Sequence, residues 1–170
     1  MLTDKKIAKN YAHLARKLNA VRKGKHVVFL SGTFDLLHTG HLIFFDFAKR
    51  QGDILVVGIA TDQNIKFYKG PKRPVIPEKL RARLAAGLAM VDHVVLLDEE
   101  ITEELDVQKI LSAIRPNKVV LLQKDPLLRS HQKLGEKLGF KVVTQARRKP
   151  LNVDFPISTS WIIEQIKKRY

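Results

Sequence analysis

The sequence predicts an α/β fold in which five parallel strands form one doubly wound sheet with helices on both faces. Apolar residues switch repeatedly between short continuous runs, typical of buried strands, and the spacing of amphipathic helices. This alternation of strands and helices is the pattern of parallel α/β sheets. A chain of 170 residues, 45% of them apolar, buries roughly two-thirds of its unfolded surface. We therefore expect a single domain over 1–170 that needs no disulfide or metal to hold its core.

The first third of the chain contains a leading helix, two strands and a helix between them. Residues 1–24 are expected to form a basic amphipathic helix, with apolar side chains at helical intervals at Ile7, Tyr11, Leu14 and Leu18. A continuous apolar run at 26–30 predicts the first strand, and the helix after it closes at Gly52. The second strand covers 54–60 and leads into a loop rich in Lys, Gly and Pro.

Strands and helices continue to alternate to the end of the chain. Three further strands are predicted at 93–97, 118–122 and 141–144. Four further helices are predicted to begin near Pro77, Thr102, Leu127 and Ser158. The first turn of a helix tolerates proline and favours negative charge, as in the pair Pro77-Glu78. The irregular stretch at 145–156 is long enough to indicate a functional or mobile segment.

The charge balance predicts an anionic partner. The chain has 31 Lys and Arg against 17 Asp and Glu, giving a formal net charge of +14 and a pI near 10.1. Such a field concentrates nucleotides, phosphorylated metabolites and nucleic acids alike, so charge alone does not choose among them. The basic residues gather at 5–25 and 126–150, without the interleaved aromatic residues of a single-strand binding face. Each stretch is either a solvated surface or an anion-binding groove.

The composition excludes several kinds of chemistry. Because the chain has no cysteine, it has no disulfide, thiolate zinc site, iron–sulfur ligation or cysteine nucleophile. No apolar run reaches the roughly 18 residues of a membrane span. The residues after Met1 also lack the apolar core of a secretory signal. We therefore expect a cytoplasmic protein without a membrane partner.

The most informative segment lies between the first strand and the helix after it, and reads Ser-Gly-Thr-Phe-Asp-Leu-Leu-His-Thr-Gly-His over 31–41. Unpaired amides at a helix start favour an anion, and Gly40 leaves room for phosphate beside the backbone. His38 and His41 are three residues apart, so both are expected to project to one side and donate hydrogen bonds to a polyphosphate. Ordinary structural histidines are one alternative. A zinc site is another, although no third ligand is signalled nearby.

Two motifs carry a family resemblance. Gly-Thr-Phe-Asp at 32–35, followed by His-x-Gly-His at 38–41, resembles the signature of the cytidylyltransferase-like nucleotidyltransferase superfamily. Its members have a Rossmann-like fold and transfer a nucleotidyl group from a nucleoside triphosphate to a phosphorylated metabolite. Ile-Ser-Thr-Ser at 157–160 resembles the second phosphate motif of this superfamily. Helix capping by Ser158 or Thr159 is the alternative explanation for that second match.

A third match lies in the loop after the second strand. The basic loop at 69–77, with Arg81 after it and Val-Asp-His-Val at 91–94 beyond, is closest in spacing and content to the adenylyltransferase domain that acts on heptose 1-phosphate, and next to glycerol-3-phosphate cytidylyltransferase and archaeal FAD synthetases. Because family members use basic residues here on phosphate, the resemblance implies phosphate contacts by Lys69 and Arg81. Lys72 and Arg73 are further candidates. By itself, the loop is equally well explained as a turn with solvated lysines.

Aspartates close to strand ends are candidates for contacts with hydroxyl groups. Asp62 and Asp125 would each accept a hydrogen bond from a sugar or polyol, or else stabilise a turn. Asp35 would orient a histidine or cap its own turn. The chain departs from its relatives at 121–125, where Leu-Leu-Gln-Lys-Asp replaces a Gly-rich stretch before the aspartate. The identities of the base and of the acceptor therefore stay open.

The resemblance implies a set of site residues. Catalytic roles are assigned to His38, His41, Lys69, Ser158 and Thr159. Nucleotide contacts are assigned to Gly32, Thr33, Phe34, Asp35, Gly40, Arg81, Asp125, Ile157 and Ser160. Acceptor contacts are assigned to Asp62, Lys72 and Arg73. No residue is assigned to a metal, because Mg²⁺ would be bound chiefly by triphosphate oxygens and water.

The expected function is transfer of AMP or CMP from ATP or CTP to a sugar or polyol phosphate, with release of pyrophosphate. A phosphate monoester has a second pKa of about 6, so it is an anionic nucleophile at neutral pH and needs no general base. The alternatives are an adenylyltransferase like the FAD synthetases, a basic nucleic-acid-binding domain and a catalytically silent nucleotide sensor. Family members often pair as homodimers, which is a further expectation for this chain.

Overall fold

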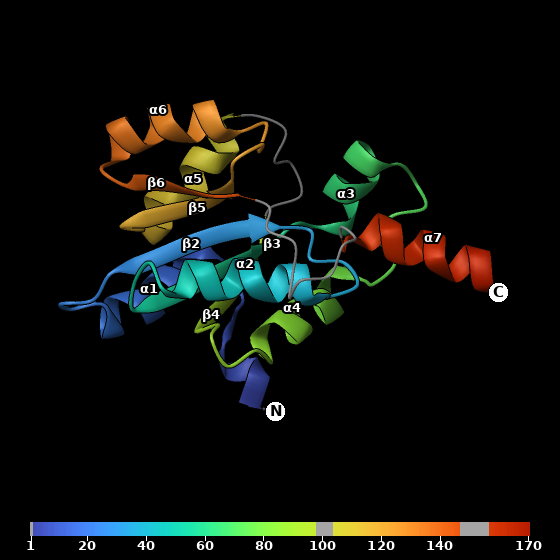
Figure 1. Cartoon of the computed structure of the whole chain (residues 1–170). Coiled ribbons are helices and arrows are strands. Elements are labelled where there is room, and N and C mark those ends of the chain that lie inside the picture. The colour runs from blue at the N-terminus through green and yellow to red at the C-terminus, as the bar shows by residue number, and fades with distance from the viewer. Residues whose placement is uncertain (1, 98–103, 147–156) are drawn as a thin grey trace.

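The computed structural model describes residues 2–97, 104–146 and 157–170 (Figure 1). Its strands are β1 Ile7–Ala8, β2 Val27–Gly32, β3 Ile54–Ile59, β4 His93–Leu96, β5 Lys118–Leu122 and β6 Lys141–Gln145. A short 3₁₀ helix, Leu2–Lys5, precedes the helices α1 Tyr11–Val21, α2 Thr39–Lys49, α3 Asp62–Lys69, α4 Glu78–Ala86, α5 Glu104–Ile114, α6 Leu128–Leu138 and α7 Thr159–Arg169. The predicted helix start at Thr102 lies outside the described residues. So do residues 147–156, which belong to the predicted irregular stretch and to the end of the predicted basic stretch.

The predicted fold class is confirmed, but the predicted strand count is wrong by one. Within the described residues, six parallel strands form one sheet in the order β1–β4–β3–β2–β5–β6. The additional strand, β1, pairs Ile7 with Val94 and Ala8 with Val95 at the sheet edge. Ile7 also fits a helical spacing, so only its pairing with the distant β4 decides its conformation.

The leading helix is shorter than the predicted span of 1–24. It begins at Tyr11, because the side chain of Asn10 accepts a hydrogen bond from the His13 amide at 2.8 Å and caps the helix there. A second difference lies after β3, where a loop was predicted and α3 is found. Thr61 caps α3.

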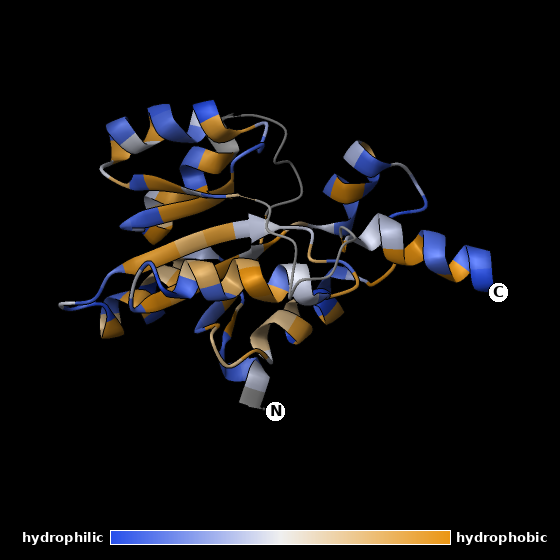
Figure 2. Ribbon diagram, viewed as in Figure 1, coloured by the Kyte–Doolittle hydropathy of each residue, from blue (hydrophilic) through white to orange (hydrophobic). Residues whose placement is uncertain are grey.

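Two apolar layers cover the two faces of the sheet. One layer contains side chains from α1, α5 and α6, and the other contains side chains from α2 and α4. Val27 and Phe29 of β2 face the first layer, whereas Val28 and Leu30 face the second. Each such buried side chain contributes about 2 kcal/mol of stability. Figure 2 shows β2 as apolar up to its last residues, as expected for a strand covered on both faces.

The chain order reverses beside β2. The chain runs from β2 to β3 and β4 on one side, and places β5 and β6 on the other. Ligands of such sheets bind beyond the carboxyl ends of the strands at this point of reversal. In Figure 1, α3 and α7 lie at this edge, and α2 begins there.

Two helices stand apart from the apolar layers. α3 and α7 contact the other elements only slightly, and Thr159 is the one buried residue of α7 among those described. In Figure 1, α7 extends away from the carboxyl edge of the sheet. Of the helices formed by residues 2–97, 104–146 and 157–170, none has the length and apolar character to cross a membrane.

Gly135 tests the packing of α6 on the strand that follows it. A Cβ at Gly135 would lie 2.6 Å from the Phe140 carbonyl oxygen, closer than packed atoms approach. Replacing glycine by alanine inside a helix normally raises stability. Because of this close contact, we expect Gly135→Ala to lower the free energy of unfolding by about 1–3 kcal/mol instead. Urea unfolding measures this change, with Gln132→Ala at an exposed position of α6 as control. Unchanged or increased stability of the Gly135 variant contradicts the contact.

Candidate active site

The turn after β2 has a constrained backbone built around Phe34. Phe34 and Leu36 have φ angles of 48° and 46°, in the left-handed region that non-glycine residues rarely adopt. The buried Phe34 ring packs edge-on against His41 and Phe45, with centroid separations of 5.3 and 4.7 Å. A Cβ on Gly32 would lie 2.8 Å from this ring, so glycine makes room for it. Phe34 therefore acts here as a packing residue beneath His41.

The start of α2 presents backbone amides without a side-chain cap. His38 is the N-cap residue, and its side chain makes no capping hydrogen bond. Its carbonyl accepts the amides of His41 and Leu42. Within the described residues, the amides of Thr39 and Gly40 have no such acceptor. These amides and the positive end of the helix dipole favour an anion at this place.

The two histidines of the motif stack on each other. Their ring centroids lie 3.7 Å apart with an interplanar angle of 19°. Both Nδ1 atoms are buried and lack a hydrogen-bond partner among the described residues. Burial lowers the pKa of His38, and burial followed by repulsion from His38 and Lys69 lowers the pKa of His41 to about 3. His41 is therefore neutral at pH 7, with one ring N–H to donate.

The start of α7 lies beside the start of α2. A Cβ on Gly40 would lie 3.5 Å from the Ile157 carbonyl oxygen. The Thr159 hydroxyl donates a 2.6 Å hydrogen bond to the Asp35 carbonyl, although the two residues are 124 positions apart. Two helix starts that are far apart in the sequence therefore lie side by side in the structure.

The hydroxyl groups at the start of α7 already have structural partners. Ser158 caps the helix by accepting a hydrogen bond from the Trp161 amide at 3.1 Å, which is the capping alternative stated for this motif. As an acceptor in that bond, the Ser158 hydroxyl keeps its own O–H to donate. Thr159 is buried, and Ser160 is exposed.

Two of the three cations predicted for the basic loop, Lys69 and Arg73, lie at the turn after β2. The Lys69 ammonium donates a 3.0 Å hydrogen bond to Thr33 Oγ1. Arg73 Nε forms an ion pair with Asp35 Oδ2 at 3.3 Å, without the alignment of a hydrogen bond. Partial burial, and then repulsion from Arg73, lower the pKa of Lys69. Lys72 is exposed.

Arg81 lies underneath the site instead of facing an open cleft. It is fully buried, and its guanidinium donates hydrogen bonds of 2.5–2.8 Å to the carbonyls of Thr33, Ala60 and Ile76 and to the Asp62 carboxylate. Arg81 thus ties the ends of β2 and β3 to the loop before α4, and Asp62 is its ionic partner. This placement differs from the open phosphate contact predicted for Arg81.

Two further carboxylates at this edge hold the backbone. Asp125 Oδ1 accepts the Leu127 amide at 2.9 Å, which is the turn role stated as the alternative to hydroxyl binding. Glu78 accepts the Asp62 amide at 2.7 Å and so links the starts of α3 and α4. Local sequence indicates only a charge effect of Glu78 at a helix start, because its acceptor role depends on a residue 16 positions away.

The histidine pair gains no further metal ligands in the described part of the chain. No group of three or more His, Asp or Glu side chains that could hold a metal ion occurs among residues 2–97, 104–146 and 157–170. The zinc alternative for His38 and His41 therefore has no support there.

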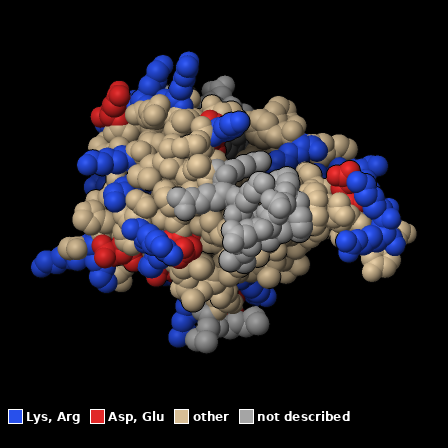
Figure 3. Space-filling view, in the orientation of Figure 1, with Lys and Arg blue, Asp and Glu red and all other residues tan. Residues whose placement is uncertain are grey.

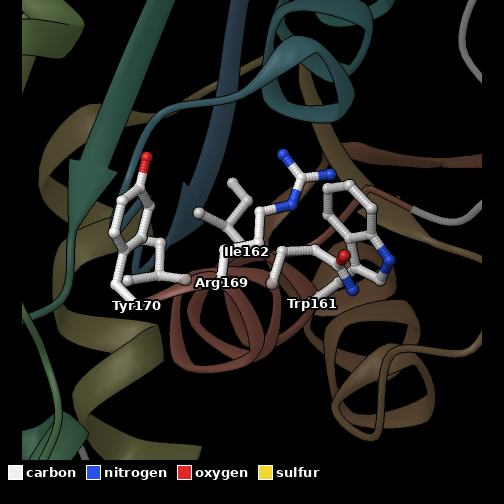
Figure 4. A pocket seen from close by; sticks show the side chains of 6 residues that line it. Trp161, Ile162, Arg169 and Tyr170 are labelled. Carbon is white, nitrogen blue, oxygen red and sulfur yellow. The ribbon is translucent and has the colours of Figure 1, made fainter.

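α7 also carries an apolar groove that none of the predicted site residues lines. Figure 4 shows its lining, which among the described residues comes from this helix and the residue after it: Trp161, Ile162, Gln165, Ile166, Arg169 and Tyr170. The last turn of α7 is basic, with Lys167, Lys168 and Arg169, and blue atoms gather at this end in Figure 3.

Comparison with known proteins gives the family. A family profile described as cytidylyltransferase-like matches residues 29–165. The chain belongs to this family. The matched region includes both helix starts, the basic loop and Arg81.

The curated relatives are longer proteins. The bifunctional protein HldE of Methylobacillus flagellatus is 45% identical over 104 residues, which cover 61% of this chain and 20% of that protein. HldE of Helicobacter acinonychis is 36% identical over 158 residues, which cover 92% of this chain and 31% of that protein. The chain thus spans between a fifth and a third of the length of these relatives.

Solved structures share the fold. A lipopolysaccharide core biosynthesis protein from Thermoplasma volcanium has a TM-score of 0.60 and 30% identity, and the match covers 74% of this chain and 98% of that one. A pantoate-beta-alanine ligase from Francisella tularensis has a TM-score of 0.66 over 95% of this chain and 76% of that one. At 21% identity, the latter shows the likeness of the fold alone.

The lowered pKa of His41 predicts a pH dependence of stability. The unfolded chain protonates this side chain near pH 6.5, whereas the folded chain does so only near pH 3. The stabilisation is therefore full above pH 6.5 and declines as the pH falls toward 3. We expect the melting temperature of His41→Asn to fall less between pH 7 and pH 4.5 than that of the wild type. NMR titration of the His41 ring is the direct check, and a midpoint near pH 6.5 contradicts the burial argument.

Proposed function

We propose that the chain transfers a nucleotidyl group from a nucleoside triphosphate, ATP or CTP, to the phosphate of a sugar or polyol phosphate and releases pyrophosphate. The observation that carries this proposal is the convergence of the uncapped start of α2, the stacked histidines and the start of α7 at the point where the strand order reverses. Family membership supports it, as do the HldE relatives.

The reaction is an in-line displacement at the α-phosphorus. An oxygen of the acceptor phosphate attacks the α-phosphorus, and the bond from the α-phosphorus to its bridging oxygen breaks. The electron pair of that bond leaves with pyrophosphate. Because a phosphate monoester is anionic at neutral pH, the protein needs no general base and acts by positioning and by neutralising charge.

Each part of the site has a place in this scheme. The ring N–H groups of His38 and His41 and the amides of Thr39 and Gly40 donate hydrogen bonds to phosphate oxygens. The polyphosphate raises the lowered pKa of His41 on binding, because an adjacent negative charge favours imidazolium. The Ser158 hydroxyl donates from the start of α7. These donors stabilise the charge that grows on the leaving pyrophosphate.

The basic loop faces the other substrate. Lys69 and Arg73 bind the acceptor phosphate, and Lys72 meets it from solvent. Arg81 and Asp62 act beneath them by fixing the loop. Mg²⁺ bound by triphosphate oxygens and water would neutralise charge on the nucleotide. The Asp62 carboxylate is paired with Arg81, and the Asp125 carboxylate accepts the Leu127 amide. We place this reaction in the cytoplasm, where nucleoside triphosphates are available.

A nucleotide panel tests the proposal directly. Thermal unfolding is measured with ATP, CTP, GTP or UTP in the presence of Mg²⁺. A ligand at about 100 times its dissociation constant stabilises by about 2.7 kcal/mol, which is visible as a raised melting temperature. We expect ATP or CTP to give the largest shift. Sugar and polyol phosphates are then assayed with that nucleotide for release of pyrophosphate. Nucleotide binding without turnover on any acceptor favours a sensor, and salt-sensitive binding to nucleic acid alone favours a nucleic-acid-binding domain.

His41 provides the mutational test. We expect His41→Ala to retain the fold and to reduce turnover about a hundredfold or more, the scale of losing one donor to the developing charge. Pyrophosphate release at saturating substrates measures this effect. The matched control is His26→Ala, at an exposed position before β2. Turnover of the His41 variant within a few-fold of the wild type would eliminate this role.

A further inference from the structure

Asp35 is the most completely engaged carboxylate of the site. Its side chain is fully buried. Oδ2 accepts the Val75 amide and Oδ1 accepts the Ile76 amide, both at 2.9 Å. Arg73 supplies the compensating charge at 3.3 Å from Oδ2. Through its carbonyl, Asp35 also accepts the Thr159 hydroxyl.

This set of bonds explains why an aspartate stands at position 35. Burying a carboxylate is costly unless it is paired and hydrogen-bonded. Here each oxygen has its own amide donor, and a guanidinium lies beside one of them. An asparagine of the same shape has one acceptor oxygen, and its NH₂ group would face one of the two amides as donor against donor.

The bonds join three separate parts of the site. Asp35 belongs to the turn before α2. Val75 and Ile76 belong to the basic loop, more than 35 residues further on, and Thr159 begins α7. Arg81 binds the Ile76 carbonyl at 2.8 Å, so the Ile76 residue is held at both its N–H and its C=O.

Asp35 itself does not face a ligand. Its carboxylate oxygens accept the backbone amides of the loop and pair with Arg73. They therefore neither orient a histidine nor bind a hydroxyl group. We propose that Asp35 is a positioning residue. It holds the basic loop against the turn before α2, like a latch. In this way it fixes the position of the cations that bind the acceptor phosphate relative to the helix starts that bind the triphosphate. This inference rests on the proposed function.

Hydrogen exchange tests the latch without any substrate. In Asp35→Asn, we expect the amides of Val75 and Ile76 to exchange at least about tenfold faster, because local opening sets their protection. Amides of β2 and β3 should keep their wild-type rates, which shows that the fold is intact. The matched control is Asp46→Asn, which breaks only an exposed ion pair with Arg50 on α2. Unchanged exchange at 75 and 76 in an intact Asp35 variant overturns the latch.

Kinetics test the positioning role. Misplacing reactive groups by about 1 Å costs on the order of a hundredfold in rate. We expect Asp35→Asn to lower kcat about a hundredfold while the dissociation constant for the nucleotide changes less than about threefold, because the helix starts are untouched. Equal losses in binding and in kcat, or no loss in kcat, contradict the positioning role. If the wild type turns over no acceptor, the proposed function fails, whereas the exchange experiment still decides the latch.

A second pair of variants keeps the inference testable if Asp35→Asn does not fold. Thr159→Val removes the hydroxyl that reaches the Asp35 carbonyl, and Thr159→Ser retains a hydroxyl there. Exchange of the Ile162 amide, in the first turn of α7, should accelerate about tenfold in the valine variant and stay within about twofold of the wild type in the serine variant. The same rate in both variants overturns the link between Asp35 and α7.

Discussion

Crowded positive charge at the carboxyl edge of the sheet is the constraint around which this protein is arranged. Partial burial, and then repulsion from Arg73 and Arg81, lower the pKa of Lys69, and the uncapped start of α2 adds the positive end of a helix. Asp35 and Asp62 each pair with one of the two arginines. An anionic ligand would offset the positive charge that remains at Lys69 and at the start of α2.

The same constraint explains the state of the histidines. Two imidazolium rings at 3.7 Å would repel each other strongly, and burial disfavours their charged forms further. Neutral rings still donate hydrogen bonds, and they gain a proton more readily once a polyphosphate lies beside them. His41 therefore adds no positive charge to the free site, and under the proposed function its pKa rises when a polyphosphate binds.

Much of this arrangement was predictable, because helix starts and strand ends have local signals. Gly40, the histidine spacing and the Ser158 cap each follow from neighbouring residues, and the parallel topology places them at one edge. The family resemblance covered the same positions. The roles of Arg81 and Asp62 were not predictable from local sequence, because Arg81 depends on carbonyl and carboxylate groups of other elements and Asp62 depends on the Arg81 guanidinium. β1 was missed for the same reason, since Ile7 fits a helical spacing and only the pairing with β4 places Ile7 and Ala8 in the sheet.

The order of apolar and polar residues along the chain determined the fold class, the position of most elements and the types of residue present at the site. These depend on local conformational preference and on periodic burial, which a single sequence carries. The tertiary structure alone decided which of the charged groups hold the backbone. Asp35, Asp62 and Arg81 are charged residues close to strand ends, and distant parts of the chain supply the groups with which they pair inside the protein.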